Sequence, residues 1–280
     1  MELPNRTEPI GSRPYLGFGL GLRREFVTQI LEQQPNLDWL EILSDWYLEE
    51  DTAEFDELLR IRERYPLVMH GGALSIGGPD PLDERYIKQL RSLAQRVRPA
   101  WISDHLCWTP PGMSHSYDLR PLPRTQEMID HLVPRILEVQ ARLGQRILLE
   151  NVSDPNLHHY SEMPEWEFVT RVAEASNSLI LLDLNNIVSN GLTQGFSAAE
   201  FVQRLPTERI WQVHLAPLVS RSEYEWDADA ALSDPVWQLY SEVLKACGPV
   251  STMLERNDDI PPLDELLEEV AQARKLAESL

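Results

Sequence analysis

Eight short apolar runs recur along the chain, and stretches with the residue spacing of amphipathic helices separate them. The runs cover 15–20 and 39–43 and then end at His70, His105, Glu150, Asp183, His214 and Glu255. Continuous apolar runs of this length are typical of strands that are buried on both faces. Strands that alternate regularly with helices form parallel sheets, so the pattern predicts an α/β fold with helical crossovers.

The stretches between the runs supply the crossover helices. Thr125, Ser197 and the pair Asp234–Pro235 are residues that commonly begin helices. Eight strand–helix units close naturally into a (β/α)₈ TIM barrel, and 280 residues suit a single domain over 1–280. The expected helices cover 23–34, 51–64, 82–97, 125–143, 165–176, 197–204, 235–246 and 263–278.

An open, doubly wound sheet is the main alternative to the barrel. Such a sheet normally carries a glycine-rich phosphate-binding turn after its first strand. Here the first run continues into GFGLGLR (17–23), where the glycines fall at every second residue and match G-x-G-x-x-G poorly. This comparison favours the barrel.

The composition limits the classes of partner. The chain has 45 Asp and Glu against 25 Lys and Arg, a net charge of −20, which opposes general nucleic-acid binding. The two cysteines, Cys107 and Cys247, give no disulfide framework. The chain shows no apolar stretch of membrane-spanning length and no apolar signal core near its start. We therefore expect a cytoplasmic protein with neither nucleic acid nor membrane as a partner.

A histidine or an acidic residue ends six consecutive apolar runs. In a parallel barrel the carboxyl ends of all strands share one rim, so these side chains are expected to meet. A single such residue is more often structural, but buried charges are costly unless they are paired or bound to metal, and six together favour a metal centre. Imidazole and carboxylate ligands suit Fe, Mn, Zn or Co. The candidate metal-binding and catalytic residues are His70, His105, Glu150, Asp183, His214 and Glu255, with Glu150 as the candidate bridge.

The other histidines fit this pattern less well. The long loop 107–123 follows the fourth run and lies on the expected catalytic face, where His115 could reach the centre. His131 falls in an expected helix, and His158 and His159 fall in a loop. Structural or solvated roles are expected for all four.

Motifs spread along nearly the whole chain resemble one known family. That family is the multinuclear non-haem iron-dependent oxidative enzymes, which includes the methanobactin-maturation oxidase. The pair LLENVS and LLDLNN is the most specific part of the resemblance. The motifs are HGGALSIG (70–77), SDHLCW (103–108), DLRPLP (118–123), LLENVS (148–153), LLDLNN (181–186), VHLA (213–216), DPVWQLY (234–240) and ERNDDIPPL (255–263).

The resemblance implies a TIM barrel related to xylose isomerase and endonuclease IV. It implies iron ions that use dioxygen to oxidise a residue, often cysteine, of a ribosomally made precursor peptide, and a partner protein that recruits the peptide. Mn or Zn could substitute for Fe at such a centre. In the family pattern one metal is bound by His70, His105 and Glu150, and a second by Glu150, Asp183, His214 and Glu255.

A third metal in the family pattern would use Asn186 and an Asp-x-His pair. This chain has Asp227 and Asp229 at the two positions of the pair, so an anionic oxygen ligand replaces the imidazole. The resemblance therefore implies two iron ions and leaves the third open. The sequence also departs from the family pattern at Asp45–Tyr47 and at Arg256–Asn257, so the resemblance does not identify the substrate.

Residues near the rim have weaker candidate roles. Asn151, Asn185 and Asn186 could orient ligands or substrate. Tyr47 and Trp108 could form walls of the pocket, although ordinary packing explains both equally well. Arg23 could bind a peptide carboxylate, although a surface salt bridge explains it more simply.

Two other functions are consistent with the sequence. A divalent-metal isomerase or phosphodiesterase could use the same barrel and ligands, although the acidic charge disfavours a nuclease. The altered third site is also compatible with a metal-poor barrel that acts as a binding module, which the six retained ligands oppose.

Overall fold

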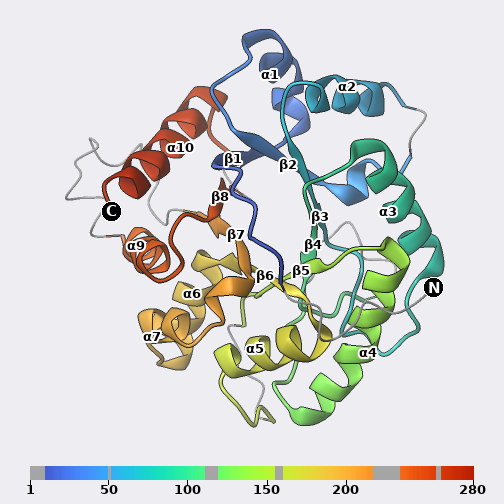
Figure 1. Ribbon diagram of the computed structural model, residues 1–280, viewed down its shortest axis with the longest axis vertical. Helices are drawn as coiled ribbons and strands as arrows, with labels where there is room; N and C mark the ends of the chain where they lie inside the picture. The colour runs from blue at the N-terminus through green and yellow to red at the C-terminus, as the bar shows by residue number, and fades with distance from the viewer. Residues whose placement is uncertain (1–9, 50–51, 111–118, 155–159, 217–233, 257–259) are drawn as a thin grey trace.

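The computed structural model describes residues 10–49, 52–110, 119–154, 160–216, 234–256 and 260–280. Eight parallel strands pair in sequence order, and β1 also pairs with β8, so the sheet is a closed barrel (Figure 1). The predicted barrel is therefore confirmed, and the open sheet is excluded. The strands are β1 (Phe18–Gly21), β2 (Trp39–Leu43), β3 (Leu67–Gly71), β4 (Ile102–His105), β5 (Ile147–Glu150), β6 (Leu179–Asp183), β7 (Ile210–Leu215) and β8 (Ser251–Leu254).

Helices surround the barrel as an outer ring (Figure 1). The α-helices are α1 (Val27–Gln33), α2 (Ala53–Arg62), α3 (Glu84–Val97), α4 (Gln126–Leu143), α5 (Glu165–Ser176), α6 (Leu184–Gln194), α7 (Ala198–Gln203), α9 (Pro235–Cys247) and α10 (Leu263–Glu278). Short 3₁₀ turns are η1 (Arg24–Phe26), η2 (Ser44–Trp46) and η3 (Thr207–Arg209). Among the described residues no helix is both long and apolar enough to cross a membrane. That the whole chain forms one domain stays a prediction.

The predicted helices form, with small shifts at their ends, but α6 was not predicted. The expected helix 23–34 divides into η1 and α1. Helix α6 is rich in polar residues and follows β6 without a linker, so no change of pattern marks its beginning. Asp183 is both the last residue of β6 and the N-cap of α6, and its side chain accepts a hydrogen bond from the Asn186 amide.

Tryptophans fill the barrel interior at the amino ends of the strands. Trp39 begins β2, and Trp101 lies just before β4. Both are fully buried, and their rings meet edge to face with centroids 6.0 Å apart. This apolar layer closes the end of the barrel away from the candidate ligands.

The glycines of the first strand serve this packing. Gly17 has a φ of +84°, a conformation that favours glycine. A Cβ atom at residue 19 would lie 2.5 Å from the Trp39 ring. At Gly21 the nearest atom to such a Cβ would be the Met253 sulfur at 3.9 Å. Close packing against the start of β2 thus requires glycine at residue 19, whereas residue 21 has room for a side chain.

We predict that Gly19→Ala lowers the free energy of unfolding by about 1–3 kcal/mol, because the added methyl must displace the Trp39 ring. Gly21→Ala adds the same methyl to the same strand where space exists and should change stability by less than about 0.5 kcal/mol. Urea unfolding of both variants tests this. Equal losses would mean that close packing at residue 19 is not what requires glycine.

A buried ionic network joins the loop before α4 to α5 and α6. The Arg124 guanidinium donates to Gln194 Oε1 at 3.1 Å and lies 3.5 Å from Glu165 Oε2. Asn190 Nδ2 donates to the same Glu165 oxygen at 3.0 Å. Burial raises the pKa of Glu165 from 4.5 to about 7, although Arg124 and Asn190 oppose the shift.

This shift predicts a pH dependence of stability. The native protein retains a proton on Glu165 between pH 4.5 and about 7 that the unfolded chain has lost, so the free energy of unfolding falls as pH rises through this range. The expected loss is on the order of 3 kcal/mol. Glu165→Gln mimics the protonated acid and should lack this component. Urea unfolding at pH 5 and pH 8 tests it, and parallel changes in the wild type and the variant would contradict it.

Candidate metal centre

The register of the barrel brings the six candidate ligands to one rim. His105 is paired with Glu150 across β4 and β5, and Asp183 is paired with His214 across β6 and β7. His70 lies one residue before the end of β3, and Glu255 directly follows β8. Parallel strands that end at the same level thus gather side chains separated by up to 185 positions in the sequence (255 − 70).

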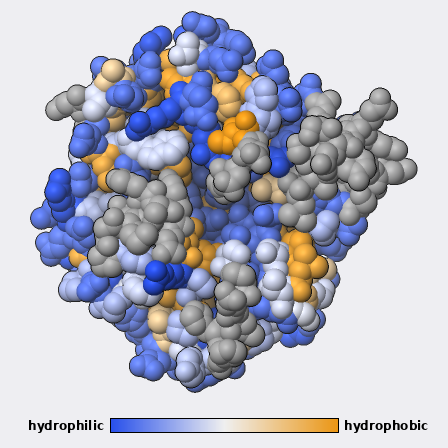
Figure 2. Space-filling view, turned by 180° about the vertical axis from the view of Figure 1, so that it is seen from behind, coloured by the Kyte–Doolittle hydropathy of each residue, from blue (hydrophilic) through white to orange (hydrophobic). Residues whose placement is uncertain are grey.

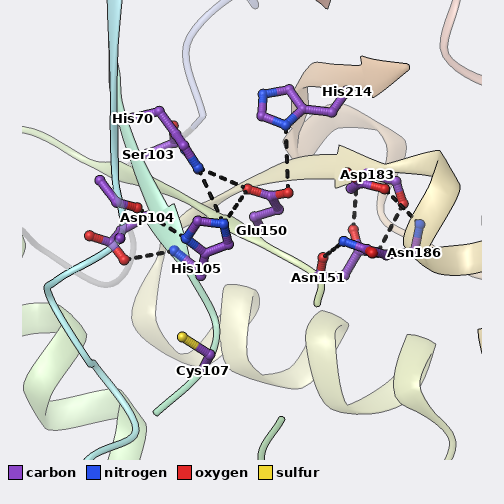
Figure 3. A network of polar contacts seen from close by, with 12 residues as sticks. His70, Ser103, Asp104, His105, Cys107, Glu150, Asn151, Asp183, Asn186 and His214 are labelled. Carbon is purple, nitrogen blue, oxygen red and sulfur yellow. Dashed lines mark hydrogen bonds and ion pairs between the residues drawn. The ribbon is translucent and has the colours of Figure 1, made fainter. Parts of the chain in front are cut away.

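The first group of side chains is His70, His105 and Glu150. Glu150 Oε2 lies 3.2 Å from His70 Nε2 and 3.3 Å from His105 Nε2. The two Nε2 atoms are themselves 3.3 Å apart. All three residues are buried, and Figure 3 shows both rings directed at the same carboxylate oxygen. These three atoms can hold a metal ion.

Hydrogen bonds assign the protons on both rings. His105 Nδ1 faces the Gly71 carbonyl oxygen at 3.1 Å and must carry the proton. His70 Nδ1 faces Ser103 Oγ at 2.9 Å, and that hydroxyl donates to the Met69 carbonyl, so His70 Nδ1 is also the donor. Both Nε2 atoms therefore direct lone pairs at the Glu150 oxygen.

Burial keeps these two rings neutral. It lowers the pKa of His70, and the neighbouring His105 adds to the shift. The pKa of His105 falls to about 4, again through burial. A neutral imidazole is the form that binds metal, so both rings are ready to serve as ligands.

The second group shares Glu150 and adds Asp183, His214 and Glu255. The ligand atoms of the four residues lie within 4.8 Å of one another. His214 Nδ1 is 3.0 Å from Glu255 Oε2 and 3.5 Å from Glu150 Oε1. Glu150 thus turns one oxygen to each group, and Figure 3 shows it between the rings of His70 and His105 and that of His214. This is the geometry expected of a bridging carboxylate.

Negative charge is concentrated in the second group. Burial raises the pKa of Asp183 well above its usual range, and the carboxylates of Glu150 and Glu255 raise it further. Burial alone would raise the pKa of Glu255, but His214 lowers it to about 2. Burial alone would lower the pKa of His214, but the carboxylates of Glu41, Glu255 and Glu150 raise it well above its usual range. The carboxylates of Glu41, Glu150 and Glu255 thus share the one cationic ring of His214, and a divalent cation would supply the missing positive charge.

Two fully buried atoms at the centre of the cluster, Glu150 Oε2 and His214 Nδ1, have no hydrogen-bond partner among the described residues. Their nearest polar neighbours lie at ion-pair distances of 3.2 Å from Glu150 Oε2 and 3.0 Å from His214 Nδ1. Orphaned buried polar atoms are costly and call for an explanation. With nitrogen and oxygen donors directed at two adjacent points, the residues fit a pair of divalent transition metals.

The asparagines lie beside the ligands and hold them. Asn151 Oδ1 accepts a hydrogen bond from the Asp183 amide, and its Nδ2 donates to the Asp183 carbonyl (Figure 3). Asn186 Nδ2 donates to the Asn151 carbonyl at 3.1 Å. Asn186 therefore lies beside the candidate ligands, with its Nδ2 directed at the Asn151 carbonyl. Asn185 Oδ1 is buried and has no hydrogen-bond partner among the described residues.

Several other predicted residues lie elsewhere. Asp227, Asp229, His115, His158 and His159 fall outside the described residues.

Three of the remaining predicted residues are not among the cavity-lining residues and make other contacts. Tyr47 is 2% exposed and packs in the core around the barrel. The Arg120 guanidinium lies over the Trp108 ring, 5.0 Å from the ring centre. His131 Nε2 bonds the Gly78 carbonyl at 3.0 Å.

A cavity of about 450 Å³ opens beside the ligands. Its polar wall includes His70, His105 and Glu255, and the predicted Arg23 also lines it. Seen from behind, the molecule is hollowed near its centre, with mostly hydrophilic residues around the hollow (Figure 2). The apolar lining of the cavity consists of Leu20, Leu22, Leu43, Leu119, Met253, Leu254, Ile260 and Leu266.

Sequence reasoning missed Glu41 and Gln212. Glu41 is buried in the middle of β2, with carboxylate oxygens 3.2 Å from His214 Nε2. Gln212 precedes His214 by two residues and also points into the barrel, where it contacts Glu41. The available signal was a lone polar residue within an apolar run, WLEIL for Glu41 and IWQVH for Gln212.

Known structures confirm the fold type. The D-psicose 3-epimerase of Clostridium cellulolyticum superposes with a TM-score of 0.64 at 12% identity, covering 94% of this chain and 98% of that chain. Endonuclease IV of Thermus thermophilus has a TM-score of 0.58 at 16% identity, covering 95% and 100% of the two chains. The fold is thus the xylose isomerase and endonuclease IV type of TIM barrel, as predicted.

Sequence relatives extend over nearly the whole chain. A UPF0276 protein of Anaeromyxobacter sp. (strain Fw109-5) is 41% identical over 266 residues, which cover 95% of this chain and 94% of the relative. A UPF0276 protein of Acaryochloris marina is 38% identical over 258 residues, 92% and 93% of the two chains. Residues 17–278 match the family model described as "RiPP precursor modification enzyme MbnB/TglH/ChrH". With this match over most of its length, on a barrel of the expected type, the chain belongs to the MbnB/TglH/ChrH family of RiPP precursor modification enzymes, as its motifs indicated.

Proposed function

We propose that this protein is an iron-dependent oxidase that uses dioxygen to modify a residue of a ribosomally synthesised precursor peptide, with cysteine as the expected target. The family supports a peptide-modifying enzyme in general. The position of Glu150, with one oxygen toward each of two ligand groups, carries the proposal of two metal ions. Bound iron would supply redox chemistry with dioxygen, and Mn or Zn could occupy the same ligands.

The ligand set proposed here follows the two groups at the rim. His70, His105 and Glu150 would hold one ion, and Glu150 with Asp183, His214 and Glu255 the other. Asp227 and Asp229, with Asn186, remain the proposed ligands of a third ion. Asn186 Nδ2 donates to the Asn151 carbonyl, so its Oδ1 would be the atom that binds such an ion.

The chain's own residues would bind and orient the peptide. The cavity of about 450 Å³ beside His70, His105 and Glu255 has a mainly apolar lining, which suits a side chain of the peptide. Asn151 holds the backbone of Asp183 through two hydrogen bonds, which fixes that carboxylate at the rim. We further propose that a partner protein recruits the peptide and that the enzyme acts in the cytoplasm.

Replacement of single ligands should separate the two ions. Glu150→Ala removes a ligand of both and should leave almost no bound metal, whereas His70→Ala should retain about one of two ions. Metal content after dialysis against a weak chelator measures this. His131→Ala is the matched control, because its ring bonds the Gly78 carbonyl away from the centre and should keep full content. Equal metal in Glu150→Ala and the wild type would disprove the shared site.

A direct test of the reaction first asks whether a short precursor-like peptide is encoded beside the gene, and then uses that peptide as the substrate. Incubated with iron-loaded protein and the recruiting partner, the peptide should change mass only when dioxygen is present, and replacement of its cysteines should abolish the change. Mass spectrometry and an oxygen electrode follow the reaction. Turnover of a sugar or of abasic DNA without consumption of dioxygen would instead support an isomerase or a phosphodiesterase. A protein that binds no metal but retains the peptide would support a binding module.

A further inference from the structure

A carboxylate that belongs to neither ligand group lies directly behind one of the candidate ligands. Glu41 lies in the middle of β2, points into the barrel and is only 4% exposed. Both of its carboxylate oxygens are 3.2 Å from His214 Nε2. His214 turns its other ring nitrogen, Nδ1, toward Glu255 and Glu150. The ring of His214 therefore stands between Glu41 and the candidate metal centre.

A chain of buried hydrogen bonds fixes Glu41 as an acceptor. The indole Nε1–H of Trp101 donates to Gln212 Oε1, which sets the orientation of the amide group. Gln212 Nε2 then donates to Glu41 Oε2. Trp101 and Gln212 are both almost completely buried, so water does not compete for these bonds. The carboxylate of Glu41 consequently presents lone pairs to its remaining neighbour, His214.

An acceptor on one side of an imidazole decides which nitrogen is free. A neutral ring carries one N–H, and a carboxylate opposite Nε2 favours the proton there. Gln212 Nε2 also lies within hydrogen-bond distance of His214 Nε2, at 2.9 Å, but the charged carboxylate of Glu41 is the stronger partner and favours a proton on His214 Nε2. Glu255 Oε2 faces Nδ1 at 3.0 Å, so the ring carries a proton on each nitrogen while no metal is bound. An ion bound at Nδ1 would take the place of the proton there, and Glu41 would keep the other proton on Nε2.

We propose that Glu41 is a positioning residue that selects Nδ1 of His214 as a metal ligand, with Trp101 and Gln212 holding Glu41 in place. The proposal rests on the metal centre of the proposed function. It divides the three histidines, because His70 and His105 place their protons on Nδ1 and offer Nε2 instead. A buried anion behind the ring also makes His214 a stronger donor to the second metal ion.

Substitution of Glu41 by glutamine tests the proposal through zinc affinity. In Glu41→Gln an amide N–H can face His214 Nε2 and move the ring proton to Nδ1, which blocks the ligand nitrogen. Titration of apo-protein with Zn²⁺ against a chromophoric chelator should show the second site weakened by about 10–100-fold and the first site unchanged. Glu165→Gln is the matched control, since it replaces another buried glutamate outside the cluster. Its two affinities should equal those of the wild type.

A measurement on the wild type keeps the test independent of how the variant folds. Long-range ¹H–¹⁵N spectra of zinc-loaded protein with ¹⁵N-labelled histidine distinguish a ring that carries its proton on Nε2 from one that carries it on Nδ1. We expect one zinc-bound ring protonated on Nε2, assigned to His214 by its absence in His214→Gln, and two protonated on Nδ1. If Glu41 only supported the fold, it would not determine which ring nitrogen of His214 carries the proton.

The outcomes separate this proposal from the proposed function. If the wild type binds two zinc ions and Glu41→Gln binds them equally well, the role of Glu41 is overturned but the metal centre is not. The same holds if Glu165→Gln loses as much affinity as Glu41→Gln. Zinc bound through Nε2 of His214 also overturns the role of Glu41 alone. A wild type that takes up no metal overturns the metal centre and this proposal together.

Discussion

The convergence of electron-pair donors on the two oxygens of Glu150 is the constraint on which the rest of the site depends. Two imidazole lone pairs meet Oε2, while the ring of His214 faces Oε1 at 3.5 Å. Buried electron-rich atoms this close repel one another unless a positive charge lies among them. Strand register, the asparagine contacts and the buried carboxylate of Glu41 all act to hold this unfavourable geometry, which is what a preorganised metal site requires.

The barrel tolerates this charge because its stabilising contacts lie elsewhere. At the amino ends of the strands the guanidinium of Arg13 donates to the carbonyls of Ile210 and Pro249, which ties β7 to the segment before β8. The buried rings of Trp39 and Trp101 pack across the interior at the same end. Stability and function are thus separated along the barrel axis, as in other parallel barrels. Ligand replacement at the rim can remove charge without removing these contacts.

The sequence predicted the barrel and six of the gathered side chains because both follow from one repeating pattern. An apolar run that ends in His or an acid fixes a strand, its direction and a rim position together. Helix α6 escaped prediction because Asp183 ends a strand and caps a helix at once, leaving no intervening turn. Glu41 escaped because it lies in mid-strand, and only the closed barrel brings β2 opposite β7, where it meets His214. Local patterns cannot show such contacts across the barrel.

The cavity decides which side of the centre an incoming molecule meets. Its lining includes His70, His105 and Glu255 but neither Asp183 nor His214, which is completely buried. A side chain entering past the apolar wall therefore approaches the ligands of the first group and the exposed edge of Glu255. Asp183 and His214 do not line the cavity, whereas Glu41 does. Because His214 is completely buried, water only weakly screens the interactions of its ring with the carboxylates of Glu150 and Glu255.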